Sequence, residues 1–167
     1  IVVFQDPPHA KAFPEMTIKT KEGDSWKDYK GVVWVDPTNK SIWEYNVAIA
    51  KDASKLGFDE LNFDYVRFPS DGNLEGVNYS RVFTKKYEIM KEFFAFVSNE
   101  LKDERPYISF DLFGMVADNK DNDLGIGQRM KDVKDVADYI SPMMYPSHYP
   151  PNYIGIKNPA EKPYEVI

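Results

Sequence analysis

Residues 60–67 read Glu-Leu-Asn-Phe-Asp-Tyr-Val-Arg, and their pattern is the clearest indication of the fold. Apolar and polar side chains alternate along it, which predicts a β-strand with one apolar and one polar face. The apolar face carries Leu61, Phe63 and Tyr65, and the polar face carries Glu60, Asn62 and Asp64. Central strands of an open parallel sheet are apolar on both faces. A polar face therefore favours the interior of a barrel near its mouth over an open sheet.

Outside this strand, segments with strand and helix patterns alternate. Strands are expected at 1–4, 60–67, 107–113 and 139–145, and helices at 41–56, 80–102 and about 130–136. Ser41 and Glu44 fit a capping box at the start of the first helix, and Gly57 fits its end. Strands that alternate with helices predict a parallel sheet with the helices outside.

The lengths of the connections indicate where a site would lie. Connections from helix to strand span only a few residues, whereas those from strand to helix are long, the longest covering 5–40. The long loops thus gather at the carboxyl ends of the strands, where barrel enzymes place their sites. We expect an α/β fold and a single domain over 1–167, a partial (β/α)8 TIM barrel of about four βα units.

Composition excludes several classes of function. The net charge of −6 argues against a nucleic-acid partner, whose phosphates require a basic surface. The absence of cysteine excludes disulfides and thiolate metal sites. No apolar run approaches the roughly 20 residues of a membrane span. Aromatic residues make up 15% of the chain, a content that serves either core packing or a sugar-binding surface.

Asp64 and Asp111 are the candidate catalytic residues. They occupy matching places near the ends of two successive strands, and adjacent strands lie roughly 4.8 Å apart. Two carboxylates about 5–9 Å apart are the machinery of glycoside hydrolases, in which one donates a proton and the other attacks or activates water. The structural alternative is that either aspartate pairs with Arg67 or caps a backbone N–H.

Other side chains at the same end of the sheet are candidates for substrate binding. Arg67 follows Asp64 by three residues and could orient that carboxylate, bind a substrate oxygen or form a structural salt bridge. The full set is Arg67, Trp34, Asp36, Asn62, Tyr145, His148 and Tyr149. Tyr65 is excluded because the strand alternation points it toward the helices, and Asp36 could instead only begin a turn.

No cofactor or metal is expected. Asp118, Asp121 and Asp123 lie close together but lack the glycine position of a calcium-binding EF-hand loop. Gly125 and Gly127 do not follow a strand directly, so they do not form a phosphate-binding loop.

Four blocks of the sequence, at 1–7, 34–37, 58–72 and 141–149, resemble a family of bacterial proteins assigned as glycoside hydrolases, which are grouped with α-amylase-like TIM barrels. The resemblance implies that strands three to six of a barrel are present here, and it implies export from a bacterial cell. In α-amylases the nucleophile is an aspartate at the end of strand four, and Asp64 matches that position. The resemblance therefore also implies that Asp64 is the nucleophile. In those enzymes an arginine precedes this aspartate by two residues and the acid on strand five is a glutamate, whereas here Arg67 follows and strand five offers Asp111.

Three functions are therefore open. The first is hydrolysis of a polysaccharide by Asp64 and Asp111. The second is a carbohydrate-binding barrel without catalysis, and the third is a metal-dependent hydrolase that uses Asp64, Asp111 and His148. Half a barrel would also expose two strand edges, so we expect this chain alone to be inactive and to associate with itself or with the remaining half.

Overall fold

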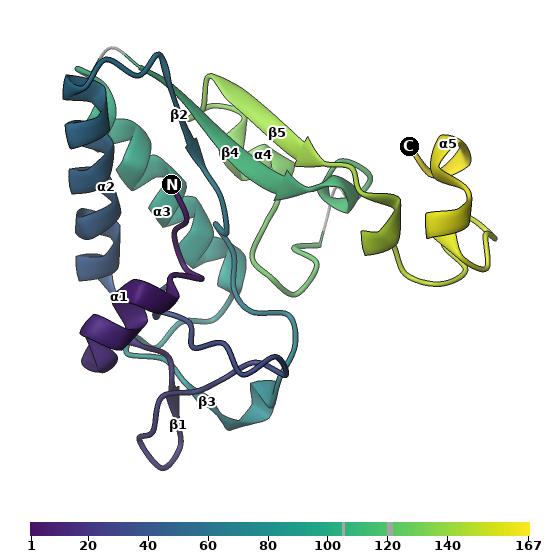
Figure 1. Ribbon diagram of the computed structural model, residues 1–167, viewed down its shortest axis with the longest axis horizontal. Coiled ribbons are helices and arrows are strands. Elements are labelled where there is room, and N and C mark those ends of the chain that lie inside the picture. The colour runs from purple at the N-terminus through teal and green to yellow at the C-terminus, as the bar shows by residue number, and fades with distance from the viewer. Residues whose placement is uncertain (105, 120–121) are drawn as a thin grey trace.

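The computed structural model describes residues 1–104, 106–119 and 122–167 (Figure 1). Its centre is a parallel sheet of three strands in the order β2 (Glu60–Phe63), β4 (Tyr107–Phe113) and β5 (Tyr139–Met143). The register sets Asn62 opposite Ser109 and Asp111 opposite Ser141. The predicted mixed α/β class with a parallel sheet is confirmed.

The first residues of the chain lie parallel to the end of β2. The backbone N–H of Asp64 donates to the Ile1 carbonyl at 2.8 Å, and the N–H of Val3 donates to the Asp64 carbonyl at 3.0 Å. This contact is an isolated bridge between Val2 and Asp64, not a full strand ladder. The side-by-side order is therefore 1–4, β2, β4 and β5, which is also the order along the chain.

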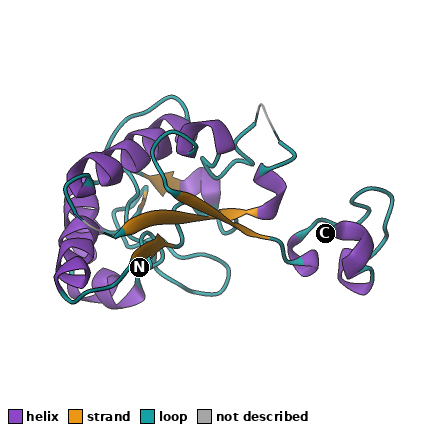
Figure 2. Ribbon diagram, turned by 90° about the horizontal axis from the view of Figure 1, so that it is seen from above, coloured by secondary structure: helices purple, strands orange, loops and turns teal. Residues whose placement is uncertain are grey.

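Three helices follow the successive parallel segments: α2 (Lys40–Lys55), α3 (Lys86–Leu101) and α4 (Met130–Val133). Figure 2 shows the two long helices, α2 and α3, gathered on one side of the sheet. The core forms there, with the rings of Phe63 and Phe94 packed on Phe110 at centroid distances of 5.4 and 4.8 Å. Burying these rings is the main favourable term for this face, and it leaves the polar residues of the strands on the opposite face.

Several predicted boundaries are wrong. The strand expected at 60–67 ends at Phe63, the strand expected at 139–145 ends at Met143, and the helix expected at about 130–136 ends at Val133. Helix α2 begins after Asn39, whose side chain accepts the N–H of Ser41 at 3.0 Å, so Ser41 and Glu44 do not form the cap. Helix α3 begins at Lys86 instead of Ser80. Phe83, expected within that helix, packs against Phe68 at 5.4 Å in the loop before it.

The two long loops that precede α2 and α3 are joined to each other. The first contains α1 (Pro7–Ala12), η1 (Pro14–Met16) and β1 (Lys19–Thr20), and the second contains η2 (Leu74–Gly76) and β3 (Val77–Asn78). Strands β1 and β3 pair in antiparallel fashion, and the indole N–H of Trp26 donates to the Asn73 carbonyl at 3.0 Å. Residues 32–35, an apolar run in the sequence, form isolated bridges in this layer instead of a strand.

The C-terminal segment runs away from the sheet (Figure 1). It contains η4 (Pro146–His148), η5 (Pro159–Glu161) and α5 (Pro163–Val166), where the sequence showed no clear period. The Tyr153 hydroxyl ties it to the loop after β4 by donating to the Asp118 carboxylate at 2.6 Å. Among the described residues, no helix has the length and apolar character needed to cross a membrane.

Candidate functional site

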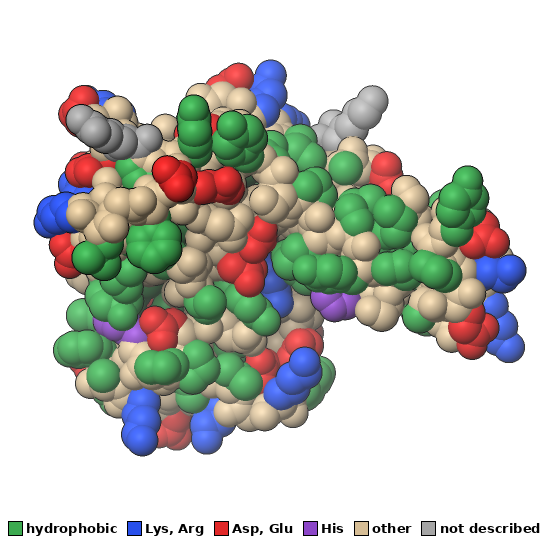
Figure 3. Space-filling view, turned by 45° about the horizontal axis from the view of Figure 1, so that its top comes forward, with side chains coloured by type: hydrophobic (Ala, Val, Ile, Leu, Met, Phe, Trp, Pro, Cys, Tyr) green, Lys and Arg blue, Asp and Glu red, His purple; other side chains and the backbone are tan. Residues whose placement is uncertain are grey.

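A cleft of about 470 Å3 lies where the strands end. It is lined by Lys30, Asp64, Tyr65, Arg67, Ser70, Asp71, Phe113, Met143, Tyr145 and His148. The space-filling view shows charged side chains in the hollow middle of this face, with a row of hydrophobic side chains running toward the C-terminal segment (Figure 3). A somewhat larger surface hollow, of about 530 Å3, lies between 20–27 and 73–76, away from the strand ends.

Asp64 is half-buried at the end of β2 and faces this cleft. Its Oδ1 accepts the N–H of Tyr65 at 2.6 Å. Within the described residues, its Oδ2 receives no hydrogen bond and no Lys or Arg lies within ion-pair distance. The structural alternative is thus met in part: Asp64 does not pair with Arg67, but its Oδ1 caps the backbone N–H of Tyr65, and its other oxygen is available to a ligand.

Asp111 lies on the polar face of the adjacent strand. The side-chain amide of Asn62 donates to its Oδ1 at 3.2 Å and to the Ser109 hydroxyl at 3.0 Å. Since Phe63 pairs with Phe110, the next residues along the two strands, Asp64 and Asp111, are at matching levels. Asp111 itself is not among the residues that line the cleft.

The surroundings of Asp111 favour its protonated form. Burial raises the pKa of this carboxyl above its ordinary value, and the nearby negative charge of Asp64 raises it further. The hydrogen bond from Asn62 and the positive charge at the N-terminus act in the opposite direction but are outweighed. A carboxyl with a raised pKa beside a second carboxylate is the arrangement that separates an acid from a base.

The guanidinium of Arg67 lies among three aromatic rings. Its central carbon is 4.9 Å from the centroid of the Trp34 ring, 5.5 Å from that of Tyr65 and 5.1 Å from that of Phe113. Its Nη1 donates to the Phe68 carbonyl at 3.0 Å. Burial lowers the pKa of Arg67 from its very high ordinary value.

Aromatic side chains from β4 and from the segment after β5 form another wall of the cleft. The ring of His148 lies 5.0 Å from that of Tyr145 and 5.9 Å from that of Phe113. Tyr145 and His148 are exposed. Rings with polar tips suit a ligand that has both apolar faces and hydroxyl groups, as a sugar does.

Four of the seven expected substrate-binding residues do not line the cleft: Trp34, Asp36, Asn62 and Tyr149. Trp34 is only 2% exposed, because its indole N–H is drawn inward to the Asp28 carboxylate at 3.1 Å, and its ring supports Arg67 from beneath. Tyr149 is also buried, since its ring packs on Tyr153 at 4.6 Å. Both side chains are covered by other parts of the protein, so neither can contact a substrate in the cleft.

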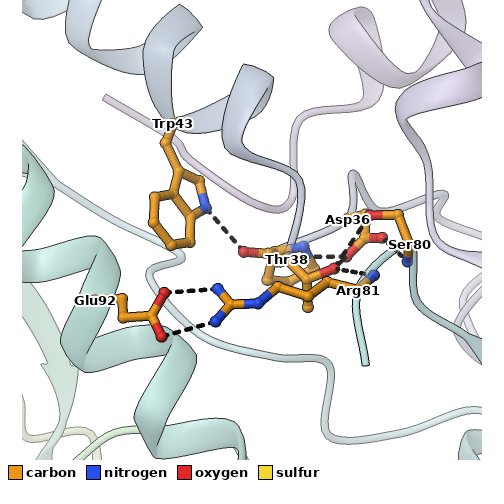
Figure 4. Close-up of polar contacts among 7 residues, drawn as sticks. Asp36, Thr38, Trp43, Ser80, Arg81 and Glu92 are labelled. Atoms are coloured by element: carbon orange, nitrogen blue, oxygen red, sulfur yellow. Dashed lines mark hydrogen bonds and ion pairs between the residues drawn. The ribbon is translucent and has the colours of Figure 1, made fainter. Parts of the chain in front are cut away.

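Asp36 is a structural residue and not part of the cleft (Figure 4). Its carboxylate accepts the N–H and hydroxyl of Thr38 at 2.8 and 2.7 Å and the N–H of Ser80 at 2.6 Å. The neighbouring Arg81 forms a double ion pair with Glu92 on α3, at 2.6 and 2.9 Å. This group, here called the Asp36 brace, fastens the first long loop to the second.

Tyr65 and Gln128 are the principal residues that the sequence did not reveal. Tyr65 has a φ of +54°, and this left-handed conformation interrupts the strand alternation, so the side chain turns into the cleft instead of toward the helices. Gln128 is fully buried, accepts the N–H of Phe113 and donates to the carbonyls of Val66 and Asp111. Phe113 could have been predicted from the sequence, because it lies two residues after Asp111 and therefore on the same face of the strand.

No group of three His, Cys, Asp or Glu side chains within the described ranges is placed to hold a metal ion. Asp64, Asp111 and His148 therefore do not form the metal-binding cluster that a metal-dependent hydrolase would require. Of the acidic loop considered from the sequence, Asp121 lies outside the described residues.

The fold and the cleft define an α/β protein with a parallel sheet and an acidic, aromatic site at the carboxyl ends of its strands. The model of the family described as "Putative glycosyl hydrolase domain" matches residues 1–167. The chain belongs to this family of glycosyl hydrolase domains, as its four sequence blocks predicted. A comparison with curated protein sequences finds no match.

Two solved structures are similar. A hypothetical protein from Ruminiclostridium thermocellum is 36% identical with a TM-score of 0.57, over 64% of this chain and 54% of that one. An α-galactosidase from Thermus thermophilus, in complex with stachyose, is 16% identical with a TM-score of 0.50, over 82% of this chain and 25% of that one. The chain thus spans about half of the first protein and a quarter of the second. At this identity the second likeness concerns the fold alone.

Proposed function

We propose that this domain is the catalytic part of a glycoside hydrolase that cleaves a polysaccharide by a two-carboxylate mechanism. Asp64 is the nucleophile or base, and Asp111 is the acid. The observation that carries the proposal is that Asp64 lies in a cleft walled by Tyr145 and His148, with an Oδ2 that receives no hydrogen bond from any described residue. Membership of a glycosyl hydrolase family supports it.

The roles follow from the surroundings of the two carboxyl groups. Asp64 faces the cleft as a carboxylate whose other oxygen is fixed by the N–H of Tyr65, so it is oriented to attack a sugar carbon or to activate water. Burial raises the pKa of Asp111, which favours the protonated form that can donate to the leaving oxygen. Asn62 positions the Asp111 carboxyl from the neighbouring strand.

The proposal includes the partial barrel. Residues 1–4, β2, β4 and β5 correspond to strands three to six, since they lie in chain order and run parallel with the long helices on one side. In a closed barrel the polar face of β2 and β4 lines the interior, which brings further strands around Asp111 and deepens the site. An extracellular or cell-envelope location in a bacterium belongs to the same proposal, and fractionation of the producing cells tests it.

A hydrolysis screen on the full-length parent protein tests the function. Neutral and acidic polysaccharides are incubated with the wild-type protein and with Asp64→Asn, and new reducing ends are measured. We expect at least one polysaccharide to be cleaved by the wild-type protein and left intact by Asp64→Asn. Binding of the same glycan, measured by affinity electrophoresis, should survive the substitution.

A non-catalytic carbohydrate-binding barrel is the second candidate, because one observation favours it. The aromatic wall of Phe113, Tyr145 and His148 is in place, whereas Asp111 does not line the cleft. A glycan that binds to the full-length protein but is never cleaved would establish this candidate in place of the hydrolase.

The isolated chain is proposed to be inactive and to associate. The outer strand β5 has an exposed edge at Tyr139, which is 51% exposed, and Val2 at the opposite side of the sheet is 47% exposed. Unpaired strand edges invite pairing with another chain. Light scattering of residues 1–167 should detect dimers or larger species, and a monomer that cleaves glycans at the full-length rate would contradict this expectation.

A further inference from the structure

Arg67 is held in its cleft by the faces of aromatic rings and not by a carboxylate. The rings of Trp34, Tyr65 and Phe113 all lie within 5.5 Å of its guanidinium carbon. Cation–π contacts of this kind engage the planar face of a guanidinium. Its N–H groups lie in the plane of the group, so they stay free at the edge for hydrogen bonding.

Most of those N–H groups have no partner within the part of the chain that the structure describes. A guanidinium has five N–H donors, and both recorded bonds of Arg67 come from Nη1, to the Phe68 carbonyl and, at 3.5 Å, to the Ser70 hydroxyl. Neither Nε nor Nη2 donates to a described residue. Nor does any described carboxylate come within 4.0 Å.

The other described arginines behave differently. Arg81 donates to both oxygens of Glu92 at 2.6 and 2.9 Å, and Arg129 does the same with Asp132 at 2.6 and 2.9 Å. Each thus forms the bidentate pair with a carboxylate for which the guanidinium fork is suited. Arg67 presents the same fork to a cleft and pairs with no carboxylate among the residues described.

The position of Arg67 is fixed before any ligand arrives. The indole N–H of Trp34 donates to Asp28 at 3.1 Å, and this holds the ring on which the guanidinium lies. A donor that is already in place loses little conformational freedom when it binds. A second cation, Lys30, lines the same cleft and balances the acids Asp64 and Asp71.

From this geometry we propose that Arg67 binds the carboxylate of an acidic sugar, so that the polysaccharide recognised by the cleft contains uronic acid. This inference rests on the proposed function and narrows its substrate class. Nε and Nη2 of the guanidinium donate to the two oxygens of the sugar carboxylate, while Tyr145 and His148 contact the sugar ring. Lys30 contributes charge at the rim of the cleft.

Two roles of Arg67 must be distinguished: binding of a sugar carboxylate and orientation of Asp64. Pairs of ligands that differ only in their acidic groups make this distinction. The probes are polygalacturonate, alginate and hyaluronan, each compared with its carboxyl-reduced form, together with carrageenan and its desulfated form. Binding is measured by affinity electrophoresis and calorimetry on the full-length parent protein carrying Asp64→Asn, so that no hydrolysis interferes. Arg67→Gln removes the charge, Arg67→Lys keeps the charge without the fork, and Arg81→Gln is the matched control outside the cleft.

We expect at least one uronate polymer to bind about 10-fold or more tightly than its reduced form, the range for a charge-assisted hydrogen bond. Arg67→Gln should abolish that difference without weakening the reduced form, Arg67→Lys should restore it only in part, and Arg81→Gln should not change it. Equal binding of the two forms, equal weakening of both by Arg67→Gln, or binding of carrageenan alone would overturn the inference. Neutral glycans that bind normally would then leave the proposed function intact, whereas a protein that binds no glycan would refute both.

Discussion

The Asp36 brace and the Asp64 cleft lie at the same end of the sheet and contain the same kinds of side chain. In the brace, the Asp36 carboxylate accepts three hydrogen bonds and Arg81 forms a double pair with Glu92. In the cleft, Asp64 accepts one recorded hydrogen bond and Arg67 pairs with no described carboxylate. Polar groups whose hydrogen bonds are all made within the protein thus hold the loops together, whereas those beside the cleft keep donors and acceptors for a ligand.

The largest expected effect is on catalysis. Asp64→Asn in the full-length protein should lower the rate of glycan hydrolysis by at least about 10³-fold, because the replacement of a nucleophile or base removes a reacting group. The unfolding temperature should change little. Unchanged hydrolysis by this variant, with the wild-type rate measured in parallel, would remove Asp64 from the mechanism.

Asp111→Asn should reduce hydrolysis of natural glycans by about 10²- to 10⁴-fold, the contribution of a general acid. Aryl glycosides with good leaving groups need less protonation and should lose less activity. The wild-type rate should fall as the pH rises through the raised pKa of Asp111, and this alkaline limb should be absent from the variant. If the alkaline limb of the pH–rate profile persisted in Asp111→Asn, the general acid would be a residue other than Asp111.

Asp111 also links stability to pH, with a defined sign. Its folded-state pKa is raised above the ordinary value, so the folded state holds the proton more tightly than the unfolded state does. The stability from this group is fully present below the unfolded pKa and is lost as the pH rises through the folded pKa. Asp111→Asn should therefore flatten this part of the pH–stability curve, as thermal unfolding between acid and neutral pH would show.

Asp36→Ala should affect stability and not chemistry. It strands the buried N–H of Thr38 and the partly buried N–H of Ser80, which costs about 1–3 kcal/mol in the free energy of unfolding. Denaturant unfolding measures this loss, with Asp36→Asn as a milder companion that retains one acceptor oxygen. A variant as stable as the wild type but catalytically dead would reverse the roles assigned to the brace and the cleft.

The smallest effect is expected at the outer part of the brace. The side chains of Arg81 and Glu92 are 40% and 43% exposed, and ion pairs this exposed contribute about 0–1 kcal/mol. Arg81→Gln should lower the free energy of unfolding by no more than that and should leave hydrolysis unchanged. A loss of several kcal/mol would mean that the pair is coupled to the rest of the brace.

The sheet and its polar face could be predicted from local alternation. Ile108, Phe110 and Leu112 are buried, while Asp111 on the other face is bonded to Asn62, as the period of two required. The brace could not be separated from the cleft in this way, since Asp36 and Asp64 both come at the carboxyl end of a segment that looks like a strand.

What separates these two aspartates is long-range packing. Two of the hydrogen bonds that Asp36 accepts come from nearby Thr38, but the third comes from the N–H of Ser80, 44 positions away, and no local pattern encodes such a contact. Tyr65 was assigned to the wrong face because a positive φ in a residue other than glycine leaves no mark in the sequence. Trp34 was expected at the surface because its buried partner Asp28 belongs to a loop without periodicity.

The most direct test of the central claim is a crystal structure of the full-length Asp64→Asn variant with a bound oligosaccharide that the wild-type protein cleaves. We predict that the sugar chain lies in the cleft between Arg67 and the wall formed by Tyr145 and His148. Its scissile bond should lie within about 3.5 Å of the residue 64 side chain, the distance of a near-attack geometry. An oligosaccharide bound elsewhere, with the cleft empty and the side chain of residue 64 out of reach, would contradict the account.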